Sequence, residues 1–293
     1  MDLNILKETQ RFPRGEKHHE GNGMIPDEPG KDILLSTRGA DGILQLTLND
    51  PVRCNALSEA MLKALGEAFD AASKNQDVRV IILSATGSVF CAGHDLKEMT
   101  AGRQNADRGR AYFTKILNQC SSVMQKIVNC TKPVIAEING IATAAGCQLV
   151  ASCDLAVASK DAQFCTPGVH IGLFCSTPMV ALSRNLANKH AMEMLLTGDT
   201  ISASRAAEIG LANKVVSSTE LGATTVALAS KIAAKSSLTV ATGKRAFYQQ
   251  KEMDLVAAYN YASNIMVENM LASDAEEGIA AFIEKRAPDW HDE

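Results

Sequence analysis

The sequence lacks long hydrophobic runs. No apolar stretch approaches the roughly 20 residues that a membrane-spanning helix needs, so we expect no membrane span. The first residues also lack the apolar segment of a secretory signal, and they mix acidic with basic side chains, which fits a mitochondrial transit peptide poorly. We therefore expect a cytoplasmic protein, with the mitochondrial matrix as the second choice.

Paired cysteines are also missing. None of the eight cysteines forms a C-x-x-C pair, and most lie in apolar or helical segments. This pattern favours reduced, buried thiols over disulfides or metal ligands. His18, His19 and Glu20 have no partner cluster in the sequence, so a solvated tail is the better interpretation. We expect no metal site.

The chain has no strong excess of positive charge. Its net charge of −4 disfavours nucleic acid and anionic membranes as partners. Its 293 residues, 46% of them hydrophobic, allow one large domain, or one domain with an appendage. Residues 1–30 are rich in glycine, proline and charge, which predicts a poorly ordered extension. We expect a core over residues 31–220 and a C-terminal helical region over residues 221–293, to which the family resemblance described below assigns oligomerisation.

Alternating hydrophobic patterns predict an α/β protein. Residues 33–37 and 43–48 flank a glycine-containing turn and predict a β-hairpin. Ser58 is placed to cap a helix that runs to about residue 75, and residues 108–129 predict a longer helix. Residues 78–84, 133–138, 154–159 and 164–166 read as strands. From about residue 178 onward we expect almost only helix.

Two runs of small residues are the most informative segments. They span residues 90–96 and 140–149, and we expect each run to open a helix. The first N–H groups of a helix have no intrahelical partner and carry the positive end of its dipole. Two such amides aimed at one point form an oxyanion hole, which stabilises negative charge on a carbonyl oxygen.

Several short motifs occur in one order along the chain. They lie at residues 49–57, 90–99, 132–136, 139–140, 153–158, 197–198, 206–212 and 277–286. In this order the chain resembles the crotonase family, also called the enoyl-CoA hydratase/isomerase superfamily. The resemblance implies a spiral of ββα units with a C-terminal helical trimerisation region, assembled as a homotrimer or dimer of trimers. It also implies an acyl-CoA thioester as ligand, so coenzyme A is part of the substrate and we expect no separate cofactor.

The resemblance also assigns binding residues. It places the oxyanion-hole amides at His94 and Ala145. It places the coenzyme A moiety beside four residues of the same subunit: Arg53, Ala56, Ala92 and Leu96. A neighbouring subunit would bring Phe282 and Lys285 to the nucleotide end, where a lysine is a suitable point charge for phosphate.

The chain departs from the family pattern at the catalytic positions. Hydratases of this family carry two glutamates, where this sequence has Gln148 and Gly168. A positioned acid or base is worth about 10²–10⁴ in rate. Gln148 can hold a water molecule but does not ionise near neutral pH, and Gly168 has no side chain. The segments around them resemble a subgroup, the enoyl-CoA hydratase domain-containing proteins of animal mitochondria and their bacterial relatives.

Other ionisable groups near these positions are candidates to replace the glutamates. His170 follows Gly168 by two residues and is a candidate acid or base, with a plain structural role as the alternative. For His94 we favour a role of the amide alone. Cys165 and Cys175 are weaker candidates, because nothing in the sequence lowers their pKa. Asp154 matches a family position that is usually structural.

Three functions stay open at this point. The first is an enzyme of fatty acid metabolism that hydrates or isomerises enoyl-CoA, for which the resemblance implies an intact binding frame. The second is an acyl-CoA decarboxylase or thioesterase, since an oxyanion hole can serve such a reaction without the glutamate pair. The third is a non-catalytic CoA-binding protein.

Overall fold

The computed structural model describes residues 32–292 of the chain. The extension expected over residues 1–30, with His18, His19 and Glu20, lies outside the described residues. Asp32 to the C-terminus forms one compact unit. Within the described part, no helix combines the length and apolar character needed to cross a membrane.

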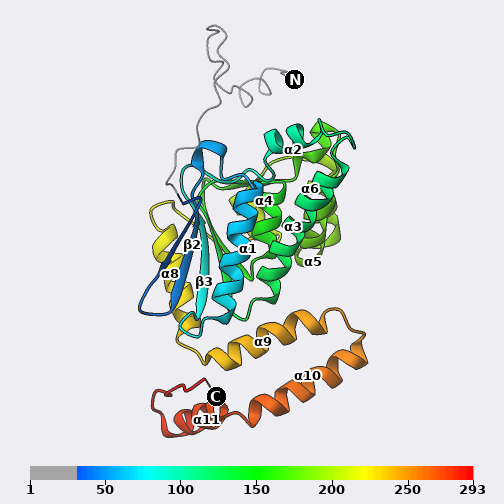
Figure 1. The fold of residues 1–293 in the computed structure, drawn as a ribbon. Coiled ribbons are helices and arrows are strands. Elements are labelled where there is room, and N and C mark those ends of the chain that lie inside the picture. The colour runs from blue at the N-terminus through cyan, green and yellow to red at the C-terminus, as the bar shows by residue number, and fades with distance from the viewer. Residues whose placement is uncertain (1–31, 293) are drawn as a thin grey trace. The chain divides into compact units, whose positions relative to one another are not determined.

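Two sheets form the core (Figure 1). The larger sheet has the order β1-β2-β3-β5-β7-β10 and the smaller has the order β4-β6-β8-β9. The strands are β1 (Leu34–Arg38), β2 (Ile43–Leu48), β3 (Val80–Ala85), β4 (Val89–Cys91), β5 (Val134–Ile138), β6 (Ile141–Thr143), β7 (Leu155–Ser159), β8 (Gln163–Cys165), β9 (Ile201–Ser202) and β10 (Lys214–Val216). From β3 to β8, successive strands alternate between the sheets and each pair is followed by helix, which confirms the predicted spiral of ββα units.

The central strand of the larger sheet is buried on both faces. On β3, Ile81 and Leu83 join the main hydrophobic core, whereas Val80 and Ile82 pack with Leu221 of α8 (Leu221–Ala233). Strand side chains alternate between faces, so a continuous apolar run is what such a strand requires. The predicted hairpin is confirmed by the antiparallel pairing of β1 with β2.

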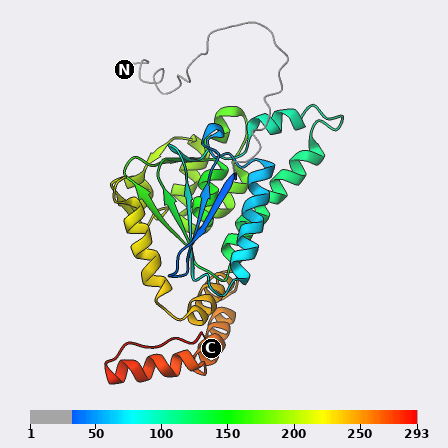
Figure 2. The same ribbon diagram turned by 60° about the vertical axis from the view of Figure 1, so that its left-hand side comes forward.

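Helices cover both faces of the larger sheet (Figure 2). Helix α8 lies on one face, and α1 (Glu59–Lys74), α3 (Arg110–Asn129) and α4 (Ala145–Ser152) lie on the other. The predicted cap of α1 is confirmed, because the Ser58 hydroxyl accepts a hydrogen bond from the Met61 amide. The remaining helices of the core are α2 (Leu96–Gly102), α5 (Ser176–Asn185), α6 (Asn188–Thr197) and α7 (Ala203–Glu208).

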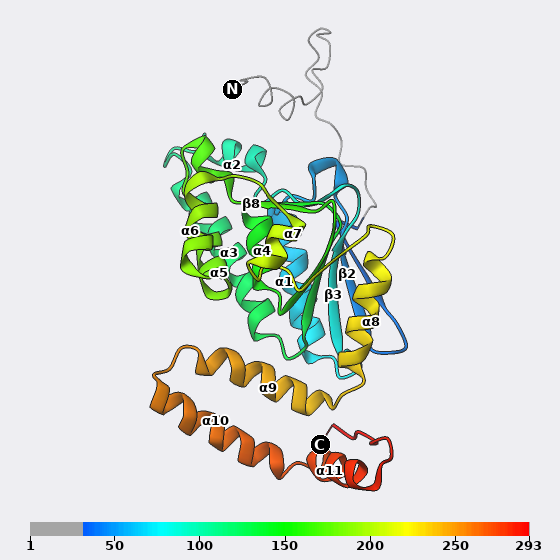
Figure 3. The ribbon, with the colours of Figure 1, turned by 180° about the vertical axis from the view of Figure 1, so that it is seen from behind.

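The C-terminal part is mostly helical, as predicted, but not throughout. Helices α9 (Ser237–Gln250) and α10 (Leu255–Met270) pack against each other below the core, and α11 (Ser273–Glu284) follows (Figure 3). The expectation of almost only helix from about residue 178 is confirmed, and β9 and β10 are the short exceptions. Strand β10 extends the larger sheet by pairing with β7, which shows that three residues suffice where an edge is available. The predicted boundary at residue 220 stays a prediction.

Candidate functional site

The two runs of small residues form backbone bends that touch. A methyl group on Gly93 would lie 3.1 Å from the amide nitrogen of Ala145 and 3.0 Å from the carbonyl oxygen of Thr143. A methyl group on Gly146 would lie only 2.1 Å from the carbonyl oxygen of Cys91. The approach of α4 to the end of β4 therefore depends on the absence of side chains at both glycines.

Strained backbone positions the start of α4. Ala144, directly before the helix, has φ 51° and ψ −117°, a conformation that an L-residue rarely adopts. Such a residue costs about 1–3 kcal/mol and persists only where the surroundings hold it. Here the Ala144 amide donates to the Cys165 carbonyl at 2.9 Å, which fixes the bend to the end of β8. The strain orients the Ala145 amide that follows.

The two predicted amides are both available. Among the hydrogen bonds of residues 32–292, neither the His94 nor the Ala145 amide is a donor. The prediction that both runs open helices is confirmed, because α4 begins at Ala145 and α2 begins at Leu96, the last residue of the first run. Asp95 caps α2 by accepting from the Lys97 and Glu98 amides, so the His94 amide precedes that helix. An extended bridge to Leu57 holds His94 in place instead.

The imidazole of His94 is closed off from solvent. Both ring nitrogens are buried, and neither has a hydrogen-bond partner among the described residues. Burial lowers the pKa of His94. The ring is therefore a neutral group at physiological pH, which agrees with a role of the His94 backbone rather than its side chain.

The structure brings four of the predicted coenzyme A residues together. The Ala92 amide donates to the Cys54 carbonyl at 3.1 Å and the Leu57 amide donates to the Gly93 carbonyl at 2.7 Å. These two hydrogen bonds place the loop with Arg53 and Ala56 against the loop with Ala92 and Leu96. The Arg53 guanidinium is held by Asp50 at 2.6 Å, and the Leu96 side chain is exposed.

The other two predicted binding residues lie elsewhere. Phe282 and Lys285 belong to the end of α11, at the opposite end of the molecule from α2 (Figure 1). They do not join the site of their own subunit. Their predicted contact therefore requires a second copy of the chain, and it stays a prediction.

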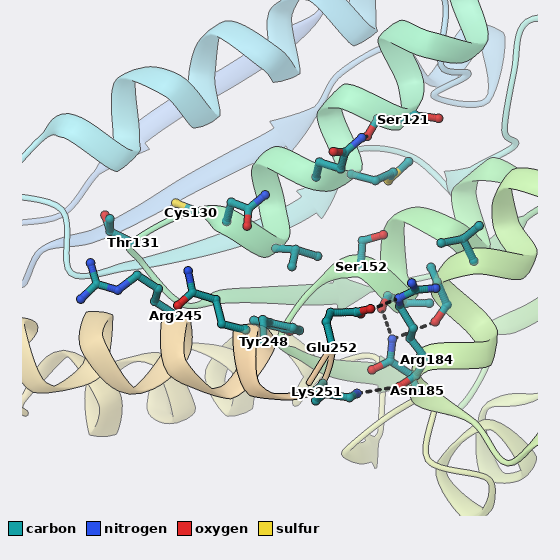
Figure 4. A pocket seen from close by; sticks show the side chains of 18 of the residues that line it. Ser121, Cys130, Thr131, Ser152, Arg184, Asn185, Arg245, Tyr248, Lys251 and Glu252 are labelled. Atoms are coloured by element: carbon teal, nitrogen blue, oxygen red, sulfur yellow. Dashed lines mark hydrogen bonds and ion pairs between the residues drawn. The ribbon is translucent and has the colours of Figure 1, made fainter. Parts of the chain in front are cut away.

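Gln148 is one of the residues that line a cavity of about 1000 Å³, here named the α3–α9 chamber. The chamber is partly open and is lined mainly by residues of α3, α4, α5 and α9, several of which are labelled in Figure 4. Gln148 is 4% exposed, and its side-chain oxygen is buried without a partner among the described residues. Gln148 lies one helical turn after Ala145, so it is the lining residue of the chamber that stands closest in sequence to the two bends.

The structure leaves no room for a side chain at Gly168. A methyl group on Gly168 would lie 2.7 Å from the Leu173 carbonyl oxygen and 2.9 Å from the Cys175 sulfur. The position that holds the second family glutamate is thus filled by backbone and thiol. Burial raises the pKa of Cys175, partly offset by a hydrogen bond from Gly168, so this thiol is a poor nucleophile.

His170 contacts a helix end. Its Nε2 lies 2.8 Å from the carbonyl oxygen of Thr197, at the end of α6, and the residue is exposed. This contact favours the structural alternative over a catalytic role. Cys165 is also engaged locally, since its thiol donates to the Thr143 hydroxyl at 3.2 Å.

Asp154 is hydrogen-bonded and structural, as expected for this position. Its carboxylate accepts from the Val134 amide at 2.7 Å, from the Lys244 ammonium at 2.7 Å and from the Tyr248 hydroxyl at 2.9 Å. Burial and the neighbouring carboxylate raise the pKa of Tyr248. These contacts fix α9 to the core. Lys244 and Tyr248 were missed in the sequence, where only their spacing of one helical turn marks them.

The cysteines are free thiols, and all but Cys54 are buried. Burial raises the pKa of Cys91 and of Cys120 to about 12, so neither thiol ionises at neutral pH. Over residues 32–292, no group of three or more potential metal-binding side chains lies together.

Comparison with known proteins places this chain in a family. The family model described as enoyl-CoA hydratase/isomerase matches residues 38–293. The rat protein named enoyl-CoA hydratase domain-containing protein 3, mitochondrial, is 51% identical over 88% of this chain and 84% of its own length.

Solved structures agree with this match. A structure titled enoyl-CoA hydratase from Mycobacterium smegmatis is 50% identical, with a TM-score of 0.85 over 89% of this chain and 100% of that chain. The structure of human enoyl-CoA hydratase domain-containing protein 3 is 48% identical, with a TM-score of 0.83 over 88% of this chain and 100% of that one. The chain belongs to the enoyl-CoA hydratase/isomerase family.

Proposed function

We propose that the chain is an enzyme that acts on acyl-CoA thioesters and holds the thioester carbonyl oxygen between the amides of His94 and Ala145. The observation that supports this most directly is the contact between two bends that each present an unused amide. Coenzyme A enters as part of the substrate, past Arg53, Ala56, Ala92 and Leu96, and no separate cofactor is needed.

The reaction we propose first is hydration or isomerisation of an enoyl-CoA. In hydration, water adds to the β-carbon and negative charge moves to the thioester oxygen. An oxyanion-hole donor is worth about 3–4 kcal/mol to such a transition state. The Gln148 amide can hold the water by hydrogen bonds, but it does not take a proton from it. We therefore expect slow turnover compared with a hydratase that has both glutamates.

Binding and turnover of crotonyl-CoA test this proposal separately. Binding between the two amides polarises the thioester carbonyl, so an isotope-edited infrared spectrum should show its stretching frequency fall. Slow loss of the enoyl absorbance should follow. A carbonyl band at its solution frequency in the bound complex would contradict the proposed hole.

Gln148→Glu is the sharpest variant, because it adds a carboxylate of the same shape and leaves Gly168 unchanged. We expect it to raise hydration of crotonyl-CoA by about 10², the lower end for one positioned base. Gln148→Ala is the matched control and should not gain activity. Equal rates for the two variants would show that residue 148 does not face the reacting carbons.

A second candidate reaction is decarboxylation of an acyl-CoA, and the closed wall at Gly168 favours it. Loss of CO₂ leaves an enolate, which needs stabilisation of the oxygen but no carboxylate base at residue 168. Release of CO₂ from malonyl-type thioesters, with no loss of enoyl absorbance, would support this candidate over hydration.

For the assembly, we propose a homotrimer or dimer of trimers built through the C-terminal helices. Support comes from large apolar side chains that are exposed on α10 and α11, among them Tyr259, Leu271 and Phe282. Large apolar side chains exposed on neighbouring helices are typical of a protein–protein interface. Light scattering should give the mass of three or six chains, and Leu271→Asp should lower it.

For the compartment, we propose mitochondria rather than the cytoplasm expected from the sequence. The support is the word mitochondrial in the name of the rat relative. Fractionation of cells of the source organism tests it, and recovery of the protein in the cytosolic fraction would contradict it.

A further inference from the structure

The α3–α9 chamber shares Gln148 with the proposed reaction centre. Gln148 lines it near the start of α4, and Ser152 lines it at the end of that helix. From Ala145 to Ser152 a helix rises about 10 Å. The Ser152 hydroxyl donates to the Gln148 carbonyl oxygen at 2.8 Å, so its hydrogen is already used within the helix. An acyl group that starts between the two amides therefore has room for several methylene groups along α4.

Helix α9 forms the far wall of this chamber. Lys244 on α9 donates to the carbonyl oxygens of Ile127 and Lys132, each at 3.0 Å, and to Asp154 at 2.7 Å. These acceptors lie at or just beyond the ends of α3 and α4, so α9 closes the chamber where those two helices end. Arg245, next in the sequence, lines the chamber at this wall.

The lining of the chamber combines apolar side chains with a few charged ones. Met124 and Val128 of α3, Ala151 of α4 and Leu238 and Ala241 of α9 give surfaces suited to a hydrocarbon chain. The charged residues that line the chamber all lie on α5 or on α9 and the turn after it. They are Arg184, Arg245, Lys251 and Glu252.

Most of these charges are already matched. Arg184 pairs with Glu252 at 3.4 Å, and Lys251 donates to the Arg184 carbonyl at 2.9 Å (Figure 4). Arg245 has no ion pair with any described residue. The lining thus carries an excess of positive charge in a chain whose net charge is −4.

We propose that the natural acyl group ends in a carboxylate, so that the substrate is a dicarboxylic acyl-CoA whose far end is bound by Arg245. This inference rests on the proposed function, because it uses the thioester position at His94 and Ala145. A guanidinium offers a planar set of donors that matches a carboxylate. A purely hydrocarbon chain of the same length would cover the Arg245 guanidinium without replacing its hydrogen bonds to water, which weakens binding.

Binding measurements on a matched pair of thioesters test the inference. Octanoyl-CoA and suberyl-CoA have the same chain length and differ by the terminal carboxylate. The wild-type chain should bind suberyl-CoA about fivefold more tightly, the ratio that one ion pair of about 1 kcal/mol gives. The preference should fall with added salt.

Two variants that each remove one positive charge test where the preference for suberyl-CoA arises. Arg245→Gln should abolish the preference for suberyl-CoA and leave octanoyl-CoA binding nearly unchanged. Lys231→Gln, on an exposed position of α8 outside the chamber, should keep the preference. Equal affinity of the wild type for both thioesters, or a preference that survives Arg245→Gln, would overturn the inference alone. Failure of both thioesters to bind the wild type would overturn the proposed function with it.

Discussion

Two sides of the candidate site are built in different ways. The side with His94 and Ala145 is made of backbone, and it is held by glycines into which no side chain fits. The opposite side, with Gly168, Cys175 and α9, is held by side chains that meet from distant parts of the sequence. The backbone side retains the features that the family resemblance implies, and the side-chain side is where this chain departs from it.

The difference indicates which part of the site can change without loss of fold. Replacing a catalytic side chain alters chemistry and leaves the oxyanion donors in place. Moving a donor requires a change in how α4 meets β4. The two backbones are so close there that a methyl group on Gly146 would lie 2.1 Å from the Cys91 carbonyl oxygen, which leaves no room for such a change. Under the proposed function, binding of the thioester and the reaction that follows are therefore separable.

The largest effect should come from the side-chain side. Lys244 is 6% exposed and Asp154 16% exposed, and their contact joins α9 to the core. Lys244→Met leaves the Asp154 carboxylate without its cation, and we expect the free energy of unfolding to fall by about 3–5 kcal/mol. Urea denaturation measures this loss.

Tyr248→Phe is the graded companion to this change. It removes one hydrogen bond to Asp154 and should cost about 1–2 kcal/mol. A loss for Lys244→Met no larger than that for Tyr248→Phe would mean that the ion pair adds little to the attachment of α9.

The next effect concerns the backbone side. Gly146→Ala puts a methyl group 2.1 Å from the Cys91 carbonyl oxygen, and neither backbone segment can move freely. We expect a loss of about 3 kcal/mol of stability, at the upper end for overpacking. Gly243→Ala, inside α9 where a methyl group meets nothing within 4 Å, should instead gain up to about 1 kcal/mol. Similar stabilities for the two variants would show that the close approach is not required.

Sequence reasoning captured the backbone side better than the side-chain side. The strands, the hairpin, the Ser58 cap and the bend at Ala145 follow from local patterns, since periodicity and small residues act over a few positions. The contacts of Lys244 depend on which distant segments meet. Asp154 and Lys244 are 90 residues apart in the sequence, and nothing near either one identifies the partner. The α3–α9 chamber was not predicted either, because its lining residues come from segments that are far apart in the sequence.

A smaller loss of stability tests whether Gly168 is tightly packed. Gly168→Ala places a methyl group 2.7 Å from the Leu173 carbonyl and 2.9 Å from the Cys175 sulfur, and should cost about 2 kcal/mol. Cys175→Ala in the same chain removes one of the two contacts, so the double variant should recover about 0.5–1 kcal/mol. Strict additivity of the two changes in a double-mutant cycle would contradict the contact.

The smallest effect is a dependence of stability on pH that reports on His94. Burial holds its folded-state pKa below the ordinary value near 6.5, so the unfolded chain takes up this proton at a higher pH than the folded chain. Stability from this group is complete above about pH 6.5 and declines as the pH falls through the interval down to the folded pKa. One proton limits the slope to about 1.4 kcal/mol per pH unit.

His94→Gln should remove the contribution of His94 to the pH dependence of stability between pH 7 and pH 5, while the amide of residue 94 keeps its place. Identical slopes for the two proteins would mean that the imidazole is equally free to take up a proton in the folded and unfolded chains. The backbone side of the site would then include an accessible acid or base, so it would not consist of backbone groups alone.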